Sequence, residues 1–139
     1  MHRAKEYLLE YQKAKRKAEF ITQQLEELEL KYKLPQAIQY SDMPKARNTE
    51  RDLSDYIVRR DKLIKKREKA LLRCINRMDD ITKRIDRMKN TREKELLWKL
   101  YVKGMRWNEV IDSMPYTERH IYRLHGSALN NFPLPKRCQ

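Results

Sequence analysis

The sequence predicts an all-α protein in which a long antiparallel helical hairpin or coiled coil is followed by a C-terminal helix-turn-helix module. Two observations lead to this fold class. Apolar residues recur at alternating spacings of three and four along most of the first 90 positions, which is the period of paired helices. The chain also has only two glycines and two phenylalanines among 139 residues, 38% of them charged, so no large compact core is available.

The first long helix is expected at about residues 3–33. Its apolar positions form a heptad seam over about four heptads, the strongest periodic signal in the chain. The helix should end at Leu34-Pro35, because the residue before a proline is pushed out of the α region. The seam consists of Ala4, Tyr7, Tyr11, Ala14, Ala18, Ile21, Leu25, Leu28 and Tyr32.

A second long helix is expected at about residues 49–89, after a loop at 34–48. Arg60 and Arg67 occupy two positions of its seam; they could snorkel outward, form a register-setting polar layer, or mark a splayed or acid-contacting part of the helix. Neither helix can bury its apolar stripe alone, so they should pair with each other, with another copy of the chain, or both. The remaining seam positions are Leu53, Ile57, Ile64, Leu71, Cys74, Met78, Ile81, Ile85 and Met88.

Three shorter helices are expected in a module at residues 91–132, followed by a tail at 133–139. Asn90 should cap the first helix with Glu93 reaching back to it, and Gly104 should end it. Pro115-Tyr116 breaks the pattern after the second helix, and Thr117 suits the cap of the third. The inward positions of the three helices are Leu97, Leu100 and Tyr101; Trp107, Val110, Ile111 and Met114; and Ile121, Leu124, Ala128 and Phe132.

The charge of the chain points to a polyanionic partner. Lys and Arg number 33 against 20 Asp and Glu, a net charge of +13, and residues 1–49, 50–90 and 91–139 carry +3, +6 and +4 of it. Nucleic acid is the simplest partner for such an excess. The last helix leaves Arg119, Tyr122, Arg123 and Gly126 facing away from its apolar side, which is what docking in a major groove requires.

Other classes of function find little support in the sequence. The two cysteines, Cys74 and Cys138, form no disulfide framework, and no Cys/His spacing resembles a zinc site. His120 and His125 are expected to be structural and not metal ligands. No nucleophile with a base, no glycine-rich phosphate loop and no paired carboxylates appear, so neither catalysis nor a cofactor is expected. No membrane span or secretion signal is found, and a cytoplasmic location is expected.

One stretch carries a family resemblance. The sequence "LLWKLYVKGMRWNEVIDSMPYTERHIYRLHGSALNNF" resembles region 4 of sigma-70-type factors and, more closely, the C-terminal part of the ArpU/RinA-like late-transcription regulators of phages and prophages of Gram-positive bacteria. The long N-terminal helices also look like that group. Two positions depart from its pattern: Arg106 stands where the group often has a hydroxyl residue, and Pro115 where many relatives have glycine.

The resemblance implies which residues contact double-stranded DNA. Those implied to read bases are Thr117, Glu118, Arg119, His120, Tyr122 and Arg123. Those expected at the phosphates are Lys103, Arg106, Ser127 and Asn130, with His125 near the backbone.

The function expected from these features is that of a sequence-specific DNA-binding transcriptional regulator that activates phage late genes. The long helices would make a homodimer or offer a surface to RNA polymerase. Two alternatives stay open: a small terminase-like subunit that packages DNA, and a sigma-like module that binds RNA polymerase or another protein and not DNA.

Overall fold

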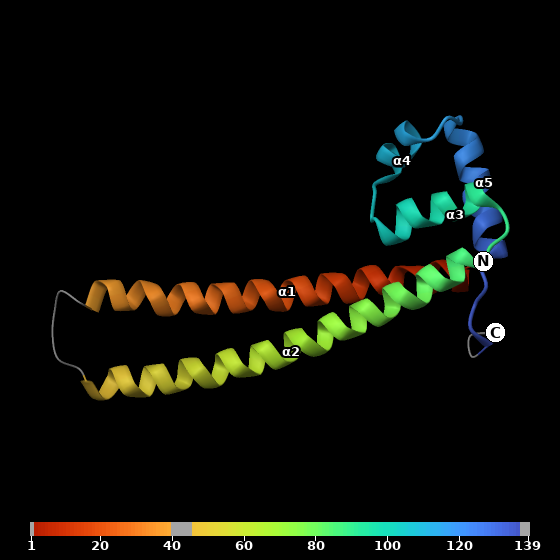
Figure 1. Ribbon diagram of the computed structural model, residues 1–139. Helices are drawn as coiled ribbons and strands as arrows, with labels where there is room; N and C mark the ends of the chain where they lie inside the picture. The colour runs from red at the N-terminus through yellow and green to blue at the C-terminus, as the bar shows by residue number, and fades with distance from the viewer. Residues whose placement is uncertain (1, 40–45, 137–139) are drawn as a thin grey trace. The chain divides into compact units, whose positions relative to one another are not determined.

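Every regular element that the structure describes is helical. The computed structural model describes the backbone of residues 2–39 and 46–136, and the side chains of residues 3–32 and 51–136. The all-α class is therefore confirmed for these residues. The elements are α1 (His2–Gln39), α2 (Ala46–Asp86), α3 (Thr91–Leu97), the π-helical segment η1 (Trp98–Val102), α4 (Trp107–Ser113) and α5 (Glu118–Asn131) (Figure 1).

The two long helices differ from the predicted boundaries. Residues 34–39 and 46–48, predicted as loop, are helical. Pro35 lacks only the N–H that would donate to the carbonyl of Lys31, and its fixed φ is itself compatible with a helix. At the other end α2 stops at Asp86, three residues early, because the N–H groups of Arg87 and Met88 turn back to the carbonyls three residues before them, at 3.2 and 3.0 Å.

The described residues form two compact units. One consists of Lys15–Leu72 and the other of Met1–Ala14 with Arg73–Gln139. Each unit contains part of α1 and part of α2.

In the unit Lys15–Leu72, α1 and α2 run antiparallel and side by side (Figure 1). Ala18 and Ile21 pack with Ala70 near one end. The rings of Tyr32 and Tyr56 stack near the other end, with centroids 4.1 Å apart. The predicted pattern of α1 is confirmed here, since Ala18, Ile21 and Leu25 are buried.

In this unit the apolar positions of the predicted α2 seam stay largely open, so pairing with α1 does not bury them, whereas Arg60 of the same seam binds Glu29 of α1 at 3.3 Å. Leu53, Ile57 and Leu71 are 41%, 47% and 42% exposed. α1 instead packs on the neighbouring face of α2, where Ala70 lies against Ala18. Two small side chains allow the helix axes to approach closely, which the large residues of the seam would prevent.

The other unit holds the larger core. The part of the α2 seam at Ile81, Ile85 and Met88 is buried there, as predicted. Arg77 pairs with Glu10 at 3.1 Å. The core combines the first turns of α1 with α2 and all the later helices, through Ala4, Tyr7, Leu8, Tyr11, Leu96, Leu97, Leu100, Tyr101, Val110, Met114, Ile121, Leu124, Ala128 and Phe132 among others.

The helix predicted to run from residue 91 to Gly104 changes its winding part of the way along. The Lys103 N–H donates to the carbonyl of Trp98, five residues back, at 2.9 Å. A π turn of this kind adds a residue to the helix and re-aims the carbonyls that follow. The Gln12 amide binds two of them, Leu100 at 2.9 Å and Tyr101 at 3.3 Å. Gly104 then takes a φ of +70°, which glycine adopts without strain.

None of the helices, over the residues described, is long and apolar enough to cross a membrane.

Candidate nucleic-acid interface

α5 is the element that carries most of the predicted site. Thr117 caps it as expected, since its Oγ1 accepts the His120 N–H at 3.2 Å. The predicted inward residues Ile121, Leu124 and Ala128 are buried, which confirms the orientation of the helix.

The outward face of α5 is continuous. Arg119, Tyr122, Arg123 and Asn130 are exposed and share one side of the helix by their spacing of three and four. Gly126 lies among them, and a Cβ added there would meet nothing within 4 Å. The face therefore presents two guanidinium groups, a phenol and a carboxamide, with the backbone of Gly126 uncovered between them.

The two guanidinium groups of this face are unpaired. Among the described residues, neither Arg119 nor Arg123 has an ion-pair or hydrogen-bond partner. Two other arginines of the same unit are paired: Arg77 and Arg84 each bind a carboxylate. An unpaired guanidinium offers its fork of donors to a phosphate or to a guanine edge.

An aromatic cluster supports the face from below. The ring of Trp107 lies 4.9 Å from that of Tyr122 and 4.9 Å, edge on, from that of His125. The Tyr101 hydroxyl lies 2.7 Å from His125 Nε2. This cluster connects α4 to α5 and limits the positions open to Tyr122, which is still 49% exposed.

Burial keeps both members of the Tyr101–His125 pair neutral. It raises the pKa of the Tyr101 phenol to about 12. Burial, with a further contribution from the positive charge of Lys5, lowers the pKa of the His125 imidazole. A neutral phenol and a neutral imidazole share this hydrogen bond, and the tautomer of His125 decides which of them donates. His125 thus has the hydrogen-bond partner expected of it.

A buried carboxylate ties α5 to α3. Glu93 is 3% exposed, and its Oε1 accepts the Ser127 hydroxyl at 2.6 Å. The Asn131 amide donates to both of its oxygens at 3.1 Å. Asn90 caps α3 as predicted, accepting the N–H groups of Arg92 and Glu93 at 3.0 and 3.5 Å. Glu93 does not reach back to complete a capping box, because its oxygens bind α5 instead.

The connection between α4 and α5 consists of residues 114–117. Met114 is extended, with a ψ of 140°, as expected for a residue before proline. Its side chain is buried while Pro115 is exposed, so the turn is anchored on one side. Tyr116 lies between the His120 ring, 5.0 Å away, and the Arg92 guanidinium, 5.3 Å from its centroid.

The start of α4 brings two more predicted residues to the surface. Lys103 and Arg106 are both exposed. The Arg106 N–H donates to Glu109 Oε2 at 3.3 Å, so the first turn is capped by Glu109 and the guanidinium stays available.

The predicted site residues are all exposed, but they do not have the same surroundings. Ser127 is held by Glu93 and Thr117 caps α5, so both have a structural contact. Lys103 and Arg106 lie before α4, on a different segment from the α5 face. The ten residues are Lys103, Arg106, Thr117, Glu118, Arg119, His120, Tyr122, Arg123, Ser127 and Asn130.

Two supporting residues of the site were not predicted, Glu93 in its contact with α5 and Gln12. The partners of Glu93 on α5 lie 34 and 38 positions away in the chain. The partners of Gln12 lie 88 and 89 positions away. No local pattern signals a contact over such separations.

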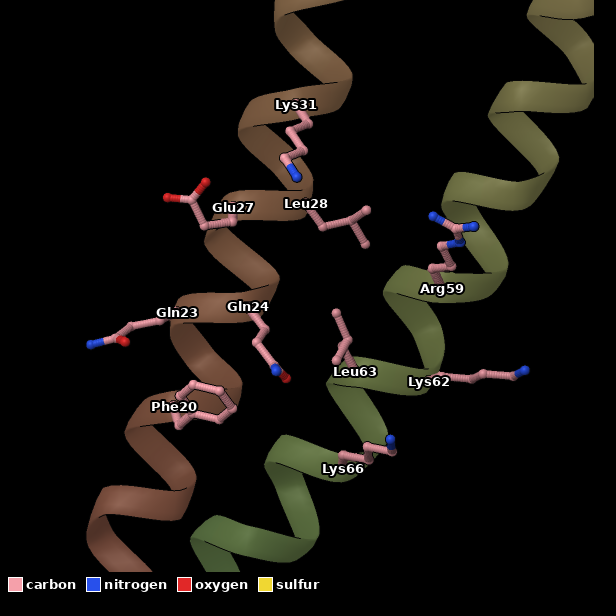
Figure 2. Close-up of a pocket in the computed structure, with 10 residues that line it drawn as sticks. All are labelled: Phe20, Gln23, Gln24, Glu27, Leu28, Lys31, Arg59, Lys62, Leu63 and Lys66. Carbon is pink, nitrogen blue, oxygen red and sulfur yellow. The ribbon is translucent and has the colours of Figure 1, made fainter.

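The unit Lys15–Leu72 has a feature of its own, a groove of about 590 Å³ between α1 and α2. Leu28 and Gln24 extend into it from α1 and Leu63 from α2, whereas Glu27 and Lys62 point away (Figure 2). Four of the ten lining residues are cationic and one is acidic, so the groove has an apolar floor and a basic rim. The cations are Lys31, Arg59, Lys62 and Lys66.

No group of three or more His, Cys, Asp or Glu side chains in the described part of the chain is placed to hold a metal ion.

Comparison of the sequence with known protein families finds a match. The model of the family described as "Protein of unknown function (DUF1492)" matches residues 45–132. No curated protein and no solved structure matches the chain.

Proposed function

The chain belongs to the DUF1492 family, whose matched residues 45–132 include every residue of the α5 face, and we propose, from the chemistry of that face, that it is a sequence-specific DNA-binding transcriptional regulator. In this proposal α4 and α5 form a helix-turn-helix, and α5 is the recognition helix. The observation that carries it is the exposed face of Arg119, Tyr122, Arg123 and Gly126, whose two guanidinium groups are unpaired among the described residues.

The chemistry of this face suits a major groove. A recognition helix presents the residues of its first turns to base edges, and Arg119 and Arg123 lie in the first two turns of α5. Arginine forms bidentate hydrogen bonds with the O6 and N7 atoms of guanine. Gly126 adds no side chain, so the backbone of α5 can come close to the duplex. Glu118 can accept a hydrogen bond from a cytosine amino group, or simply favour the helix N-terminus.

Contacts to phosphates set the register in this proposal. Lys103, Arg106 and Asn130 are exposed, and their side chains suit contacts with the sugar-phosphate backbone. The Ser127 hydroxyl gives its only proton to Glu93, so in this arrangement it has none for a phosphate oxygen. The net charge of +13 favours any DNA, so the base-reading residues must supply the selectivity.

The finer assignment rests on the resemblance to the ArpU/RinA-like regulators and to sigma region 4. It makes the chain an activator of phage late genes in a bacterial cytoplasm. A packaging subunit of the small terminase type would bind DNA through the same face.

The test is selection of bound sequences from a random double-stranded DNA library at moderate salt, followed by affinity measurements on the selected site. Replacement of Arg119 or Arg123 by alanine should weaken binding to that site by about 1–3 kcal/mol, roughly 5- to 150-fold. Binding to unrelated DNA should change far less. Arg73→Ala, which removes an exposed arginine elsewhere in the same unit, is the matched control.

The outcomes separate the candidates. A wild-type chain that enriches no sequence would contradict the proposal. A ring-sized assembly that enriches a packaging site would favour the terminase-like alternative.

A protein-binding role is a second candidate, and the basic-rimmed groove favours it. An apolar floor bordered by four cations suits an acidic amphipathic helix of a partner such as RNA polymerase. If the double variant Arg119→Ala, Arg123→Ala activates transcription as well as the wild type, this second role replaces the first.

A further inference from the structure

α2 has a row of large apolar side chains that α1 leaves open. We call Leu53, Ile57, Ile64 and Leu71 the apolar stripe; they lie on one face of α2 at spacings of four, seven and seven. Three of them are 41–47% exposed, and Ile64 is half-buried. All four belong to the unit Lys15–Leu72.

Single exposed apolar residues are ordinary on a protein surface, but a heptad row of them marks a helix interface. The residues of the apolar stripe recur at the spacing of a helix interface, and the stripe lies beside the face of α2 that packs against α1. A helix with two adjacent seams packs against two partners. The second partner is not supplied by the described part of this chain.

Charged residues border the apolar stripe on both sides, with one sign on each side. Asp61 and Glu68 each follow a stripe residue by four positions and lie on one side, and both are exposed. Arg60 and Arg67 each follow a stripe residue by three positions and lie on the other. The Arg60 side chain is 44% exposed although it binds Glu29 at 3.3 Å. The Arg67 Nε is buried with no hydrogen-bond partner among the described atoms.

This arrangement is self-complementary in only one orientation. When two identical helices pair in parallel, the acidic side of each stripe lies opposite the arginine side of the other stripe. Asp61 and Glu68 then meet the arginines of the second copy. When they pair antiparallel, each flank faces its own copy, which sets acid against acid and arginine against arginine. Ile57, Ile64 and Leu71 repeat every seven residues, which is the spacing of one coiled-coil position.

The opposite side of the helix pair does not suit a second copy. Its groove is lined by Lys31, Arg59, Lys62 and Lys66 with only Glu27 to offset them (Figure 2). Two such basic rims would repel each other.

We propose that the apolar stripe is the dimer interface of the protein, covered by the same stripe of a second copy in parallel register. The chain then leaves α2 at the same end in both copies. The pairing does not depend on the proposed function. If α5 reads DNA, however, the dimer suits a site with two half-sites, as two-fold symmetric regulators do.

The first experiment is the solution mass of the full chain without DNA, by light scattering over a range of micromolar concentrations. We expect twice the chain mass of 17.1 kDa. Ile57→Asp should raise the dimer dissociation constant at least tenfold. Val58→Asp is the matched control, because Val58 is the neighbouring residue, is 50% exposed against 47% for Ile57, and points to a different face. Its mass should stay that of a dimer.

Orientation is tested by cross-linking in a background with Cys74→Ser and Cys138→Ser. Ile57→Cys alone, and Leu71→Cys alone, should each form a disulfide-linked dimer under mild oxidation. Cross-linking only when the two cysteine variants are mixed would overturn the parallel register.

A wild-type chain with the mass of a monomer at every concentration would contradict the proposed interface. A dimer whose dissociation constant is unchanged by Ile57→Asp would contradict it as well. Helix content measured by circular dichroism must be unchanged for the aspartate variants, and Leu71→Asp serves if Ile57→Asp unfolds. Because these readouts involve no DNA, their failure leaves the proposed function to be judged by its own experiment.

Discussion

At the scale of single residues, Glu93 shows how a structural contact shapes the surface that surrounds it. Its carboxylate is buried and accepts hydrogen bonds from Ser127 and Asn131 on α5. A buried charge is tolerated only when such donors satisfy it. Ser127 is therefore as much a part of the fold as a candidate phosphate contact, a distinction that its exposed position in the sequence pattern could not reveal.

Ser127→Ala should separate these two roles. Removing one donor from a buried carboxylate should lower the free energy of unfolding by about 1–3 kcal/mol. Asn130→Ala is the control, since Asn130 is exposed on the α5 face, and its replacement should leave the free energy of unfolding nearly unchanged while weakening DNA binding. Chemical denaturation measures both. Equal stability of the two variants would show that the Glu93 contact contributes little.

The Tyr101–His125 pair predicts a dependence of stability on pH. Because burial lowers the pKa of His125 in the folded chain, the unfolded chain takes up a proton first as the pH falls. The free energy of unfolding should therefore decrease as the pH falls from the ordinary pKa of histidine, about 6.5, toward the lower folded value. Denaturation between about pH 5 and 8 measures the slope.

His125→Phe should reduce this slope, because it removes the titrating group whose pKa burial lowers. A slope that is the same in His125→Phe and the wild type would assign it to other groups.

At the scale of elements, α5 was the most predictable part of the candidate site. Its cap at Thr117 and its buried face follow from spacings within one helix, because the helical period is local. The contacts that hold α5 in place do not. Trp107 and Glu93 reach it from α4 and α3, and the π turn of η1 re-aims the carbonyls that Gln12 binds. Such contacts depend on how the helices pack against one another, and they produce no repeating pattern in the sequence.

Gly126→Ala tests whether α5 approaches a partner closely. The substitution should raise the free energy of unfolding by about 0.5–1 kcal/mol, because glycine weakens a helix interior and the added methyl meets no atom of the unit within 4 Å. It should nevertheless weaken binding to the selected DNA site if the backbone lies against the duplex. Thermal unfolding and DNA affinity, measured on the same preparation, check the two effects. Gain of stability with unchanged affinity would mean that the helix does not dock at Gly126.

At the scale of the whole molecule, the described chain combines two surfaces of different chemistry. The α5 face offers cations and a phenol, and the apolar stripe of α2 offers leucine and isoleucine. The first suits a polyanion and the second suits another helix, so DNA reading and self-association would use separate residues. A variant at Arg119 should therefore leave self-association unchanged, and a variant at Ile57 should leave the α5 face itself unchanged.

The sequence by itself determined that the described elements are helices and, for α1 and α5, most of the residues that face inward, because these follow from a period of 3.6 residues within each helix; buried Leu8 and Leu129 were not among them. It did not determine which face of α2 would meet α1. Both faces carry apolar residues, and the choice depends on the close packing of Ala18 with Ala70 and on the pairing of Arg60 with Glu29. Only the tertiary structure decided this, because steric fit and charge pairing between distant segments exist only once the segments are together.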